Sequence, residues 1–244
     1  MGTDTAADRH QAMVPGEPEA AAASAPVRVL VGHYGSGKTE VAVSLAMRLA
    51  AAGHRVALGD LDVVNPYFRS RERAEVLTAA GIEVISSTLG HSITQDLPAI
   101  SPELHRPLAD PGCEVLLDVG GNDIGTRALV EFLPDLRRRA AQVLLVVNAY
   151  RPDTADLSGV LRHLRAIEDT CGLAVTGLVS NTHVCRETTT VDVRAGYRLT
   201  AEVRDATGIP IAYVCGIPEA LAGLEPNLDG ELIPVGLYLR DPWM

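Results

Sequence analysis

The chain has 244 residues, of which 47% are hydrophobic and 21% charged, and its formal net charge is −10 at pH 7. This length and apolar content suffice for one large domain with a buried core, and they exclude a mostly disordered chain. No apolar run approaches the roughly 20 residues that span a bilayer, and the acidic charge is opposite to that of a diffuse nucleic-acid binder, so we expect neither a membrane nor a nucleic acid as partner.

Residues 1–25 are rich in Ala, Pro and Glu and lack the basic start and apolar core of a secretory signal. We expect a disordered N-terminal tail there, a single domain over residues 26–244, and the cytoplasm as location. The chain has four cysteines and no C-x-x-C pair, with the thiols at Cys113, Cys171, Cys185 and Cys215. This spacing indicates neither a zinc nor an iron–sulfur site, so we expect small buried side chains.

Short apolar runs alternate with longer helical patterns along the rest of the chain. Runs typical of buried strands occupy residues 27–31, 55–58, 82–85, 114–119, 142–148, 173–180 and 211–214. Helical patterns occupy residues 39–52, 69–80, 102–108, 126–140, 153–170 and 191–207. Because this alternation is typical of a parallel sheet buried on both faces, we predict an α/β fold with a mostly parallel central sheet flanked by helices on both faces. Such sheets bind ligands at the carboxyl ends of their strands.

Residues 32–39 follow the first predicted strand and read Gly-His-Tyr-Gly-Ser-Gly-Lys-Thr, which matches the phosphate-loop pattern G-x-x-x-x-G-K-[ST]. Glycines let backbone N–H groups turn inward and form a nest for phosphate oxygens beside the positive end of the next helix. Lys38 is the only lysine among 21 cationic residues. The one lysine therefore falls where this motif needs it.

The motif predicts a role for each of its residues. The backbone is expected to bind phosphate at Gly32, Gly35, Ser36 and Gly37. Lys38 would reach the β- and γ-phosphates and contribute to catalysis, and Thr39 would hold Mg²⁺ through its hydroxyl.

Aspartates follow two other predicted strands of the sheet. Asp60 and Asp62 end the second strand, and Asp118 ends the strand over residues 114–119. A carboxylate beside a phosphate loop can orient Mg²⁺ through its waters, and one of the first pair could position or deprotonate an attacking water. Aspartates at strand ends are also common in turns and helix caps, so the prediction depends on the neighbouring loop.

The chain resembles the SIMIBI class of P-loop NTPases, and within it the CobQ/CobB/MinD/ParA nucleotide-binding family. The matching segments are residues 32–39, 60–62 and 118–121, together with Asn181 after a predicted strand. The stretch 60–71 is similar to a little-characterised ATP-binding branch of that family.

This resemblance implies ATP with Mg²⁺ as ligands and switch regions over residues 60–71 and 118–127. It implies that Asp62 positions the lytic water and that Asp118 and Asp60 belong to the magnesium shell. It also implies that Asn181 reads adenine, although an asparagine at a strand end can simply form a turn. Pro218 follows the last predicted strand, where related proteins shape the base pocket.

The loop departs from the family pattern at its second and third positions. MinD/ParA-type loops resemble G-K-G-G-x-G-K-T, and their first lysine crosses a nucleotide-sandwich dimer to the partner's phosphates. Here His33 and Tyr34 occupy these positions, so that lysine-dependent activation is not expected, and a homodimer remains one possibility. Arg69 and Arg71 could supply the positive charge, or they could lie on a solvated face.

Three functions are compatible with these residues. The favoured one is an Mg²⁺-dependent ATPase that acts as a nucleotide-driven switch or accessory factor for an unidentified partner. The alternative is an ATP-dependent small-molecule kinase or ligase of the dethiobiotin or cobyrinate amide synthase type, with residues 65–71 and 86–111 lining an acceptor pocket. The third is a nucleotide-holding protein without useful turnover. A metal other than magnesium is not expected, because no ligand-spaced pair is formed by His33, His91, His105 and His183.

Overall fold

The computed structural model describes residues 26–62, 74–86, 102–121 and 123–238. The predicted tail over residues 1–25, Arg69 and Arg71 of the first predicted switch, and residues 87–101 of the predicted acceptor segment lie outside the described residues. Hypotheses about these positions therefore remain predictions.

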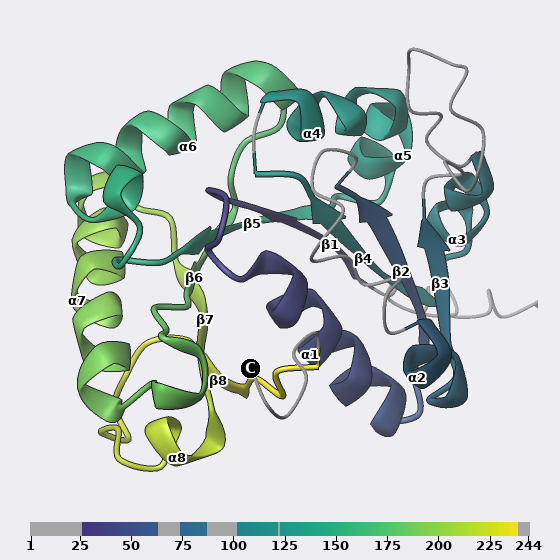
Figure 1. Ribbon diagram of the computed structural model, residues 1–244. Helices are drawn as coiled ribbons and strands as arrows, with labels where there is room; N and C mark the ends of the chain where they lie inside the picture. The colour runs from purple at the N-terminus through teal and green to yellow at the C-terminus, as the bar shows by residue number, and fades with distance from the viewer. Residues whose placement is uncertain (1–25, 63–73, 87–101, 122, 239–244) are drawn as a thin grey trace, which may run out of the picture.

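The described residues form one sheet of eight parallel strands in the order β3-β2-β4-β1-β5-β6-β7-β8 (Figure 1). The strands are β1 (Val27–Val31), β2 (Arg55–Leu61), β3 (Ile82–Ser86), β4 (Cys113–Val119), β5 (Gln142–Val147), β6 (Gly177–Ser180), β7 (Ile211–Gly216) and β8 (Glu231–Pro234). The predicted α/β fold with a parallel central sheet is confirmed. Since β1 lies between β4 and β5, the loop that follows it is flanked by strand ends on both sides.

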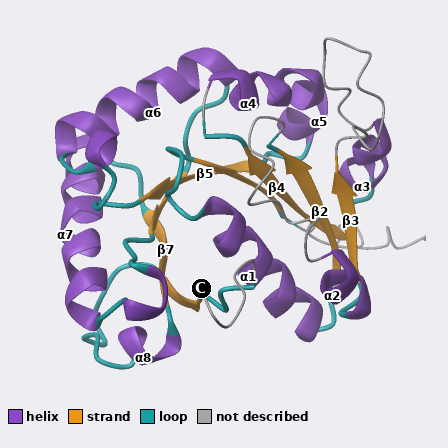
Figure 2. Ribbon diagram, viewed as in Figure 1, coloured by secondary structure: helices purple, strands orange, loops and turns teal. Residues whose placement is uncertain are grey.

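Helices cover both faces of the sheet (Figure 2). The α-helices are α1 (Lys38–Ala51), α2 (Ala74–Ala79), α3 (His105–Ala109), α4 (Asp123–Arg127), α5 (Leu133–Arg138), α6 (Leu157–Cys171), α7 (Thr190–Thr207) and α8 (Pro218–Leu221). Single 3-10 turns occupy Pro102–Leu104, Ala128–Phe132, Pro152–Thr154 and Cys185–Glu187. Buried side chains of α1 and α2 form one core with the sheet, and those of α3, α5, α6, α7 and α8 form the other.

Neighbouring residues of the central strands contribute to different cores. In β1, Val29 and Val31 pack on the α6–α7 side, whereas Leu30 packs on the α1 side. All three side chains are fully buried. Because successive side chains of a strand point to opposite faces, a strand buried on both faces needs an unbroken apolar run. This is the pattern from which the strand was predicted.

Two predicted elements differ from the structure for local reasons. The helix predicted over residues 126–140 is divided into α4, a 3-10 segment and α5, and Pro134 stands in the first turn of α5, where its missing N–H is tolerated. The strand predicted over residues 173–180 begins only at Gly177. The Val175 N–H donates to Glu168 Oε1 of α6 at 2.7 Å, so it is not available to a neighbouring strand.

Strand β8 and helix α8 were not predicted. Only Ile233 of β8 is buried, so the strand carries little apolar periodicity. Within the described part of the chain, no helix combines the length and apolarity needed to cross a membrane.

Candidate functional site

The loop between β1 and α1 depends on three glycines with positive φ. The φ angles are +145° at Gly32, +73° at Gly35 and +85° at Gly37. A Cβ on Gly32 would lie 2.5 Å from the Val146 carbonyl oxygen, and a Cβ on Gly37 would lie 2.4 Å from Asn181 Nδ2. Only glycine combines this backbone conformation with such close approach. The loop therefore has the tightly curled form that the phosphate-loop motif predicts.

Lys38 is the first residue of α1 and is buried. Its Nζ donates to the His33 carbonyl oxygen at 3.1 Å, so the side chain folds back over the loop. Burial lowers the pKa of the ammonium group, and the nearby carboxylates of Asp118 and Asp62 oppose that shift. The only lysine of the chain thus lies between the loop and the acidic groups.

Two buried carboxylates face each other on the β2–β4 side of the loop. Asp60 and Asp118 are paired in register across these strands, and both are buried. Burial, and after it the nearby Asp60, raise the pKa of Asp118 to about 7, although Lys38 and Thr39 oppose the shift. Asp62 follows the strand end, where its backbone N–H donates to Asp60 Oδ1 at 3.1 Å. Two like charges buried together favour a cation between or beside them.

The residues predicted to hold magnesium come together here. Thr39 lies close enough to Asp118 to lower the pKa of that carboxyl group, yet no described residue donates a well-formed hydrogen bond to either Asp118 oxygen. Carboxylate and hydroxyl oxygens are the ligands that Mg²⁺ prefers, and Mg²⁺ commonly takes only one or two carboxylates beside water and substrate phosphates. The set Thr39, Asp60 and Asp118 therefore fits this ion. Within the described segments, no group of three or more His, Cys, Asp or Glu residues is arranged to hold a metal ion, at this site or elsewhere.

Amide and guanidinium groups flank the loop on the other side, at the ends of β5 and β6. Asn181 Nδ2 donates to the Ser36 carbonyl oxygen at 2.8 Å. Arg151 Nε and Asn148 Nδ2 both donate to the Gly35 carbonyl oxygen, at 2.8 and 3.4 Å. The sequence analysis missed Asn148 and Arg151 as site residues. Asn148 ends the predicted strand over residues 142–148 and Arg151 lies three residues beyond it, and this place at a strand end is the signal that could have found them, as it did for Asn181.

The His33 side chain contacts residues of its own chain instead of extending toward a partner molecule. Its Nε2 lies 2.9 Å from an Asp153 carboxylate oxygen, and its Nδ1 lies 2.8 Å from the Tyr34 carbonyl oxygen. Its ring also meets that of His163 on α6 edge-on, with 5.5 Å between ring centroids. The side chain that departs from the family pattern is therefore tied to the β5–α6 region of the same molecule.

A pocket of about 300 Å³ opens beside the loop. The predicted site residues that line it are Gly35, Gly37, Lys38, Thr39, Asp62 and Asn181. Gly32, Ser36, Asp60 and Asp118 are buried and do not line it. Pro218 lines a neighbouring groove instead, which shares Ile217 and Val235 with the pocket. The prediction of buried cysteines is correct for three of the four, but Cys185 is half-buried and lines the pocket.

Comparison with known proteins gives consistent results. The family described as the CobQ/CobB/MinD/ParA nucleotide binding domain matches residues 30–198. The signal recognition particle protein of Thermus aquaticus is 29% identical over 219 residues, which are 85% of this chain but only 45% of that relative. The chain thus spans less than half the length of this curated relative.

Solved structures share the fold. The cell division protein FtsY of Thermotoga maritima has 24% identity and a TM-score of 0.54, covering 93% of this chain and 71% of that one. Chloroplast FtsY of Physcomitrella patens has 23% identity and a TM-score of 0.53, covering 77% of this chain and 57% of that one. Together with the family match, these similarities confirm the predicted SIMIBI class of P-loop NTPases.

Proposed function

The chain belongs to the CobQ/CobB/MinD/ParA nucleotide-binding family, and we propose that it binds ATP with Mg²⁺ and hydrolyses it as a nucleotide-driven switch for a partner protein. One observation carries this proposal. The buried Lys38 lies between a loop of positive-φ glycines and the facing carboxylates of Asp60 and Asp118. An ammonium group, a nest of amides and a pair of carboxylates together suit a polyphosphate with its magnesium ion.

The residues divide the chemistry between them. The loop amides and Lys38 bind the phosphate oxygens and stabilise the negative charge that moves to the leaving oxygen. Thr39, Asp60 and Asp118 would hold Mg²⁺, which when bound neutralises charge on the terminal phosphates. Asp62 lines the pocket and orients the attacking water. Its carboxylate lies against Gly120, since a Cβ on Gly120 would be 3.1 Å from Asp62 Oδ1.

The choice of ATP is supported by the end of β6. Asn181 is followed by Thr182, His183 and Val184, so the chain lacks the lysine and aspartate of the N-K-x-D motif typical of guanine recognition. We assign the adenine contact to the Asn181 amide, which lines the pocket. Pro218 shapes the adjoining groove on the same side.

Both switch regions begin where a strand reaches the site. Asp62 follows β2, and residues 118–121 lead from β4 past the phosphate loop. A Cβ on Gly121 would lie only 2.6 Å from the Tyr34 backbone nitrogen, so this segment touches the loop directly. A change in the loop on hydrolysis would therefore be passed to the segment, where a partner can detect it.

The experiment compares the wild-type protein with two variants. Titration calorimetry with Mg²⁺ and ATP or GTP gives affinity, and phosphate release gives turnover, alone and with lysate fractions. We expect Lys38→Ala to lower affinity for ATP by about a hundredfold or more. Asp62→Ala should still bind ATP, and its turnover should fall by a factor of about 10²–10⁴.

Three outcomes would contradict the proposal. No binding of any nucleotide by the wild type would refute the site itself, and tighter binding of GTP than ATP would refute the choice of base. ADP formation that requires an added metabolite pool would favour the kinase or ligase alternative over the switch. Size measurement with ATP and with ADP tests whether the nucleotide drives dimerisation.

A further inference from the structure

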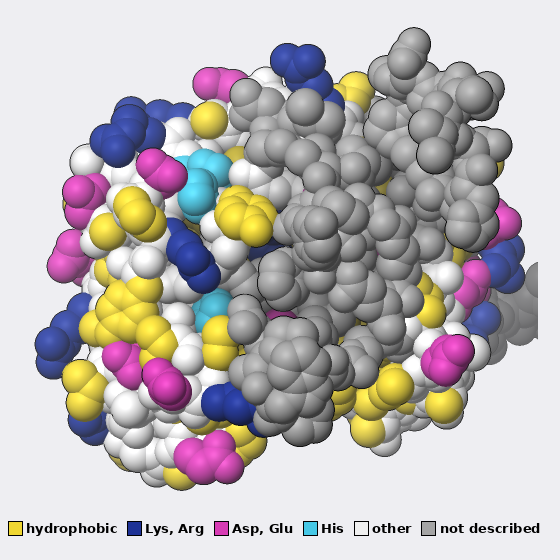
Figure 3. Space-filling view, viewed as in Figure 1, with side chains coloured by type: hydrophobic (Ala, Val, Ile, Leu, Met, Phe, Trp, Pro, Cys, Tyr) yellow, Lys and Arg dark blue, Asp and Glu magenta, His cyan; other side chains and the backbone are white. Residues whose placement is uncertain are grey.

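The two sides of the phosphate loop differ in their charged groups. Sheet order places the ends of β2 and β4, with Asp60, Asp62 and Asp118, on one side of β1. It places β5 and β6 on the other side, where the guanidinium of Arg151 contacts the Gly35 carbonyl oxygen and the carboxylate of Asp153 contacts the His33 ring. Figure 3 shows basic and histidine side chains close together on this face, over the region between β5 and α6.

Arg151 lies directly on the loop. Its Nε donates to the Gly35 carbonyl oxygen at 2.8 Å, and its guanidinium carbon is 2.8 Å from where a Cβ of Gly35 would stand. The side chain is half-buried and lines the same pocket as Lys38.

Arg151 has no anionic partner in the described part of the chain. The nearest acidic residue along its own loop, Asp153, contacts His33 instead, and no ion pair of Arg151 with a described residue is formed. A guanidinium group has five N–H donors, and only the Nε donor is used by a described residue. Its two terminal nitrogens remain available to a ligand in the pocket.

The position along the sheet indicates which part of a nucleotide Arg151 meets. The pocket is lined in sheet order by Asp62 after β2, Arg151 after β5, Asn181 after β6, and Ile217 after β7. The magnesium ligands therefore lie at one end, with the terminal phosphates, and the base-binding residues at the other. Arg151 stands between them.

We propose that Arg151 binds the nucleotide at the phosphate nearest the ribose, as a second cation of the site beside Lys38. This inference rests on the proposed nucleotide binding. Planar guanidinium groups form charge-assisted hydrogen bonds to phosphate oxygens. A phosphate placed there would meet the guanidinium of Arg151, the ammonium of Lys38 and the positive end of α1 together. His33 does not reach toward a second molecule, because it contacts Asp153 of its own chain. Arg151 would therefore supply the second positive charge from within the same molecule.

The test uses Arg151→Gln, which removes the charge but retains an N–H donor for Gly35, and Arg151→Ala. Arg162→Ala is the matched control, because Arg162 is an exposed arginine on α6 that bonds Ser158. In titration calorimetry with Mg²⁺-ATP and Mg²⁺-ADP, both Arg151 variants should bind the nucleotide about tenfold to a hundredfold more weakly than the wild type. The factor should be the same for the two nucleotides, with turnover at saturating ATP within about threefold of wild type. The wild-type affinity should also fall more steeply with added KCl than that of Arg151→Gln.

Each other result has a distinct meaning. Wild-type affinity in both Arg151 variants overturns this inference alone, provided that Lys38→Ala still loses binding. A loss confined to ATP, or to turnover, overturns the assignment to the inner phosphate and points to the terminal one. An equal loss for ATP and ADP without a change in salt dependence means that Arg151 only supports the loop. Absence of binding by the wild type refutes the proposed function instead. Thermal unfolding of each variant shows whether the fold is retained.

Discussion

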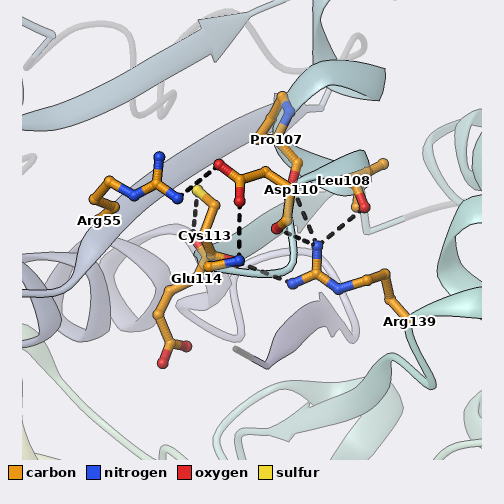
Figure 4. A network of polar contacts seen from close by, with 8 residues as sticks. Arg55, Pro107, Leu108, Asp110, Cys113, Glu114 and Arg139 are labelled. Atoms are coloured by element: carbon orange, nitrogen blue, oxygen red, sulfur yellow. Dashed lines mark hydrogen bonds and ion pairs between the residues drawn. The ribbon is translucent and has the colours of Figure 1, made fainter. Parts of the chain in front are cut away.

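Charged side chains are buried at both ends of the parallel sheet, and the two ends differ in how those charges are matched. At the amino-terminal end, Arg28 Nη1 donates to Glu114 Oε2 at 2.6 Å, with both side chains largely buried. Nearby, the Arg139 guanidinium donates to four backbone carbonyl oxygens, those of Pro107, Leu108, Asp110 and Cys113 (Figure 4). The Arg28 and Glu114 charges thus meet each other, and the Arg139 charge meets several acceptors.

At the carboxyl-terminal end, two carboxylates are buried side by side. Asp60 and Asp118 face each other, Lys38 bonds a carbonyl oxygen rather than a carboxylate, and the pKa of Asp118 is raised to about 7. Opposite charges buried together offset each other's desolvation cost, whereas like charges buried together lower the stability of the folded chain until a ligand neutralises them. The comparison teaches that burial of a charge alone does not mark a functional site, whereas burial of a carboxylate beside a second carboxylate points to one. It also predicts that removing a buried charge lowers the free energy of unfolding at the amino-terminal end of the sheet and raises it at the carboxyl-terminal end.

The largest effect is expected from Arg28→Met. It leaves the Glu114 carboxylate buried without its guanidinium partner, which should lower the free energy of unfolding by about 3–5 kcal/mol. The double variant Arg28→Met/Glu114→Leu should recover most of that loss, and nucleotide affinity should stay unchanged in both. Urea unfolding and titration calorimetry measure the two quantities. A double variant as unstable as the single one would mean that packing, not charge, dominates at this end.

Arg139→Met should lower the free energy of unfolding somewhat less, by about 2–3 kcal/mol. Four carbonyl oxygens lose a donor, but water can reach part of the half-buried site. The neighbouring Arg138 is an exposed residue that pairs with Asp135, so Arg138→Met is the control and should change stability by less than about 1 kcal/mol. Equal effects of the two substitutions in urea unfolding would refute the assigned role of the Arg139 network.

The sequence alone predicts the parts of the site that are contiguous in the chain. Gly35, Gly37, Lys38 and Thr39 stand in one motif, and the structure brings them to one pocket. Arg151 could not be assigned in this way, because its contact with Gly35 joins residues 116 positions apart. Such a contact depends on the order β1-β5 in the sheet, which a single sequence does not specify.

The fold, too, could be predicted only where a short stretch of sequence carries a clear pattern. The central strands were predicted because they are buried on both faces, whereas the edge strand β8 buries only Ile233 and left no pattern. The three arginines at positions 137–139 look equivalent in sequence. The structure gives each a different partner: Gly172 O for Arg137, Asp135 for Arg138 and four carbonyl oxygens for Arg139.

Asp118→Asn should raise the stability of the folded chain, whereas the substitutions of Arg28 and Arg139 should lower it. The folded-state pKa of Asp118, about 7, lies above its ordinary value of 3.8, so the folded chain holds this proton more tightly than the unfolded chain. Its contribution to stability is present at low pH and is lost as pH rises through 7. Without nucleotide and Mg²⁺, the variant should therefore exceed wild-type stability by about 2 kcal/mol at pH 8 and by little at pH 5. It should also lose Mg²⁺-dependent nucleotide affinity.

Urea unfolding at the two pH values tests the sign of the Asp118 effect. A variant that is less stable than wild type at pH 8 would show that Asp118 is matched within the folded chain. The distinction between the two ends of the sheet would then fail at its central residue.

The smallest effect is expected from His54→Ala, which tests how the amino-terminal end is balanced. His54 Nδ1 lies 3.7 Å from Glu114 Oε1, and its side chain is 50% exposed. Arg28 already contacts the other oxygen of the same carboxylate at 2.6 Å, so the histidine adds a weak, solvent-screened interaction. Stability should change by less than about 0.5 kcal/mol in urea unfolding. A loss comparable to that of Arg28→Met would mean that Glu114 needs both partners, so that this end also holds a charge that one partner cannot match.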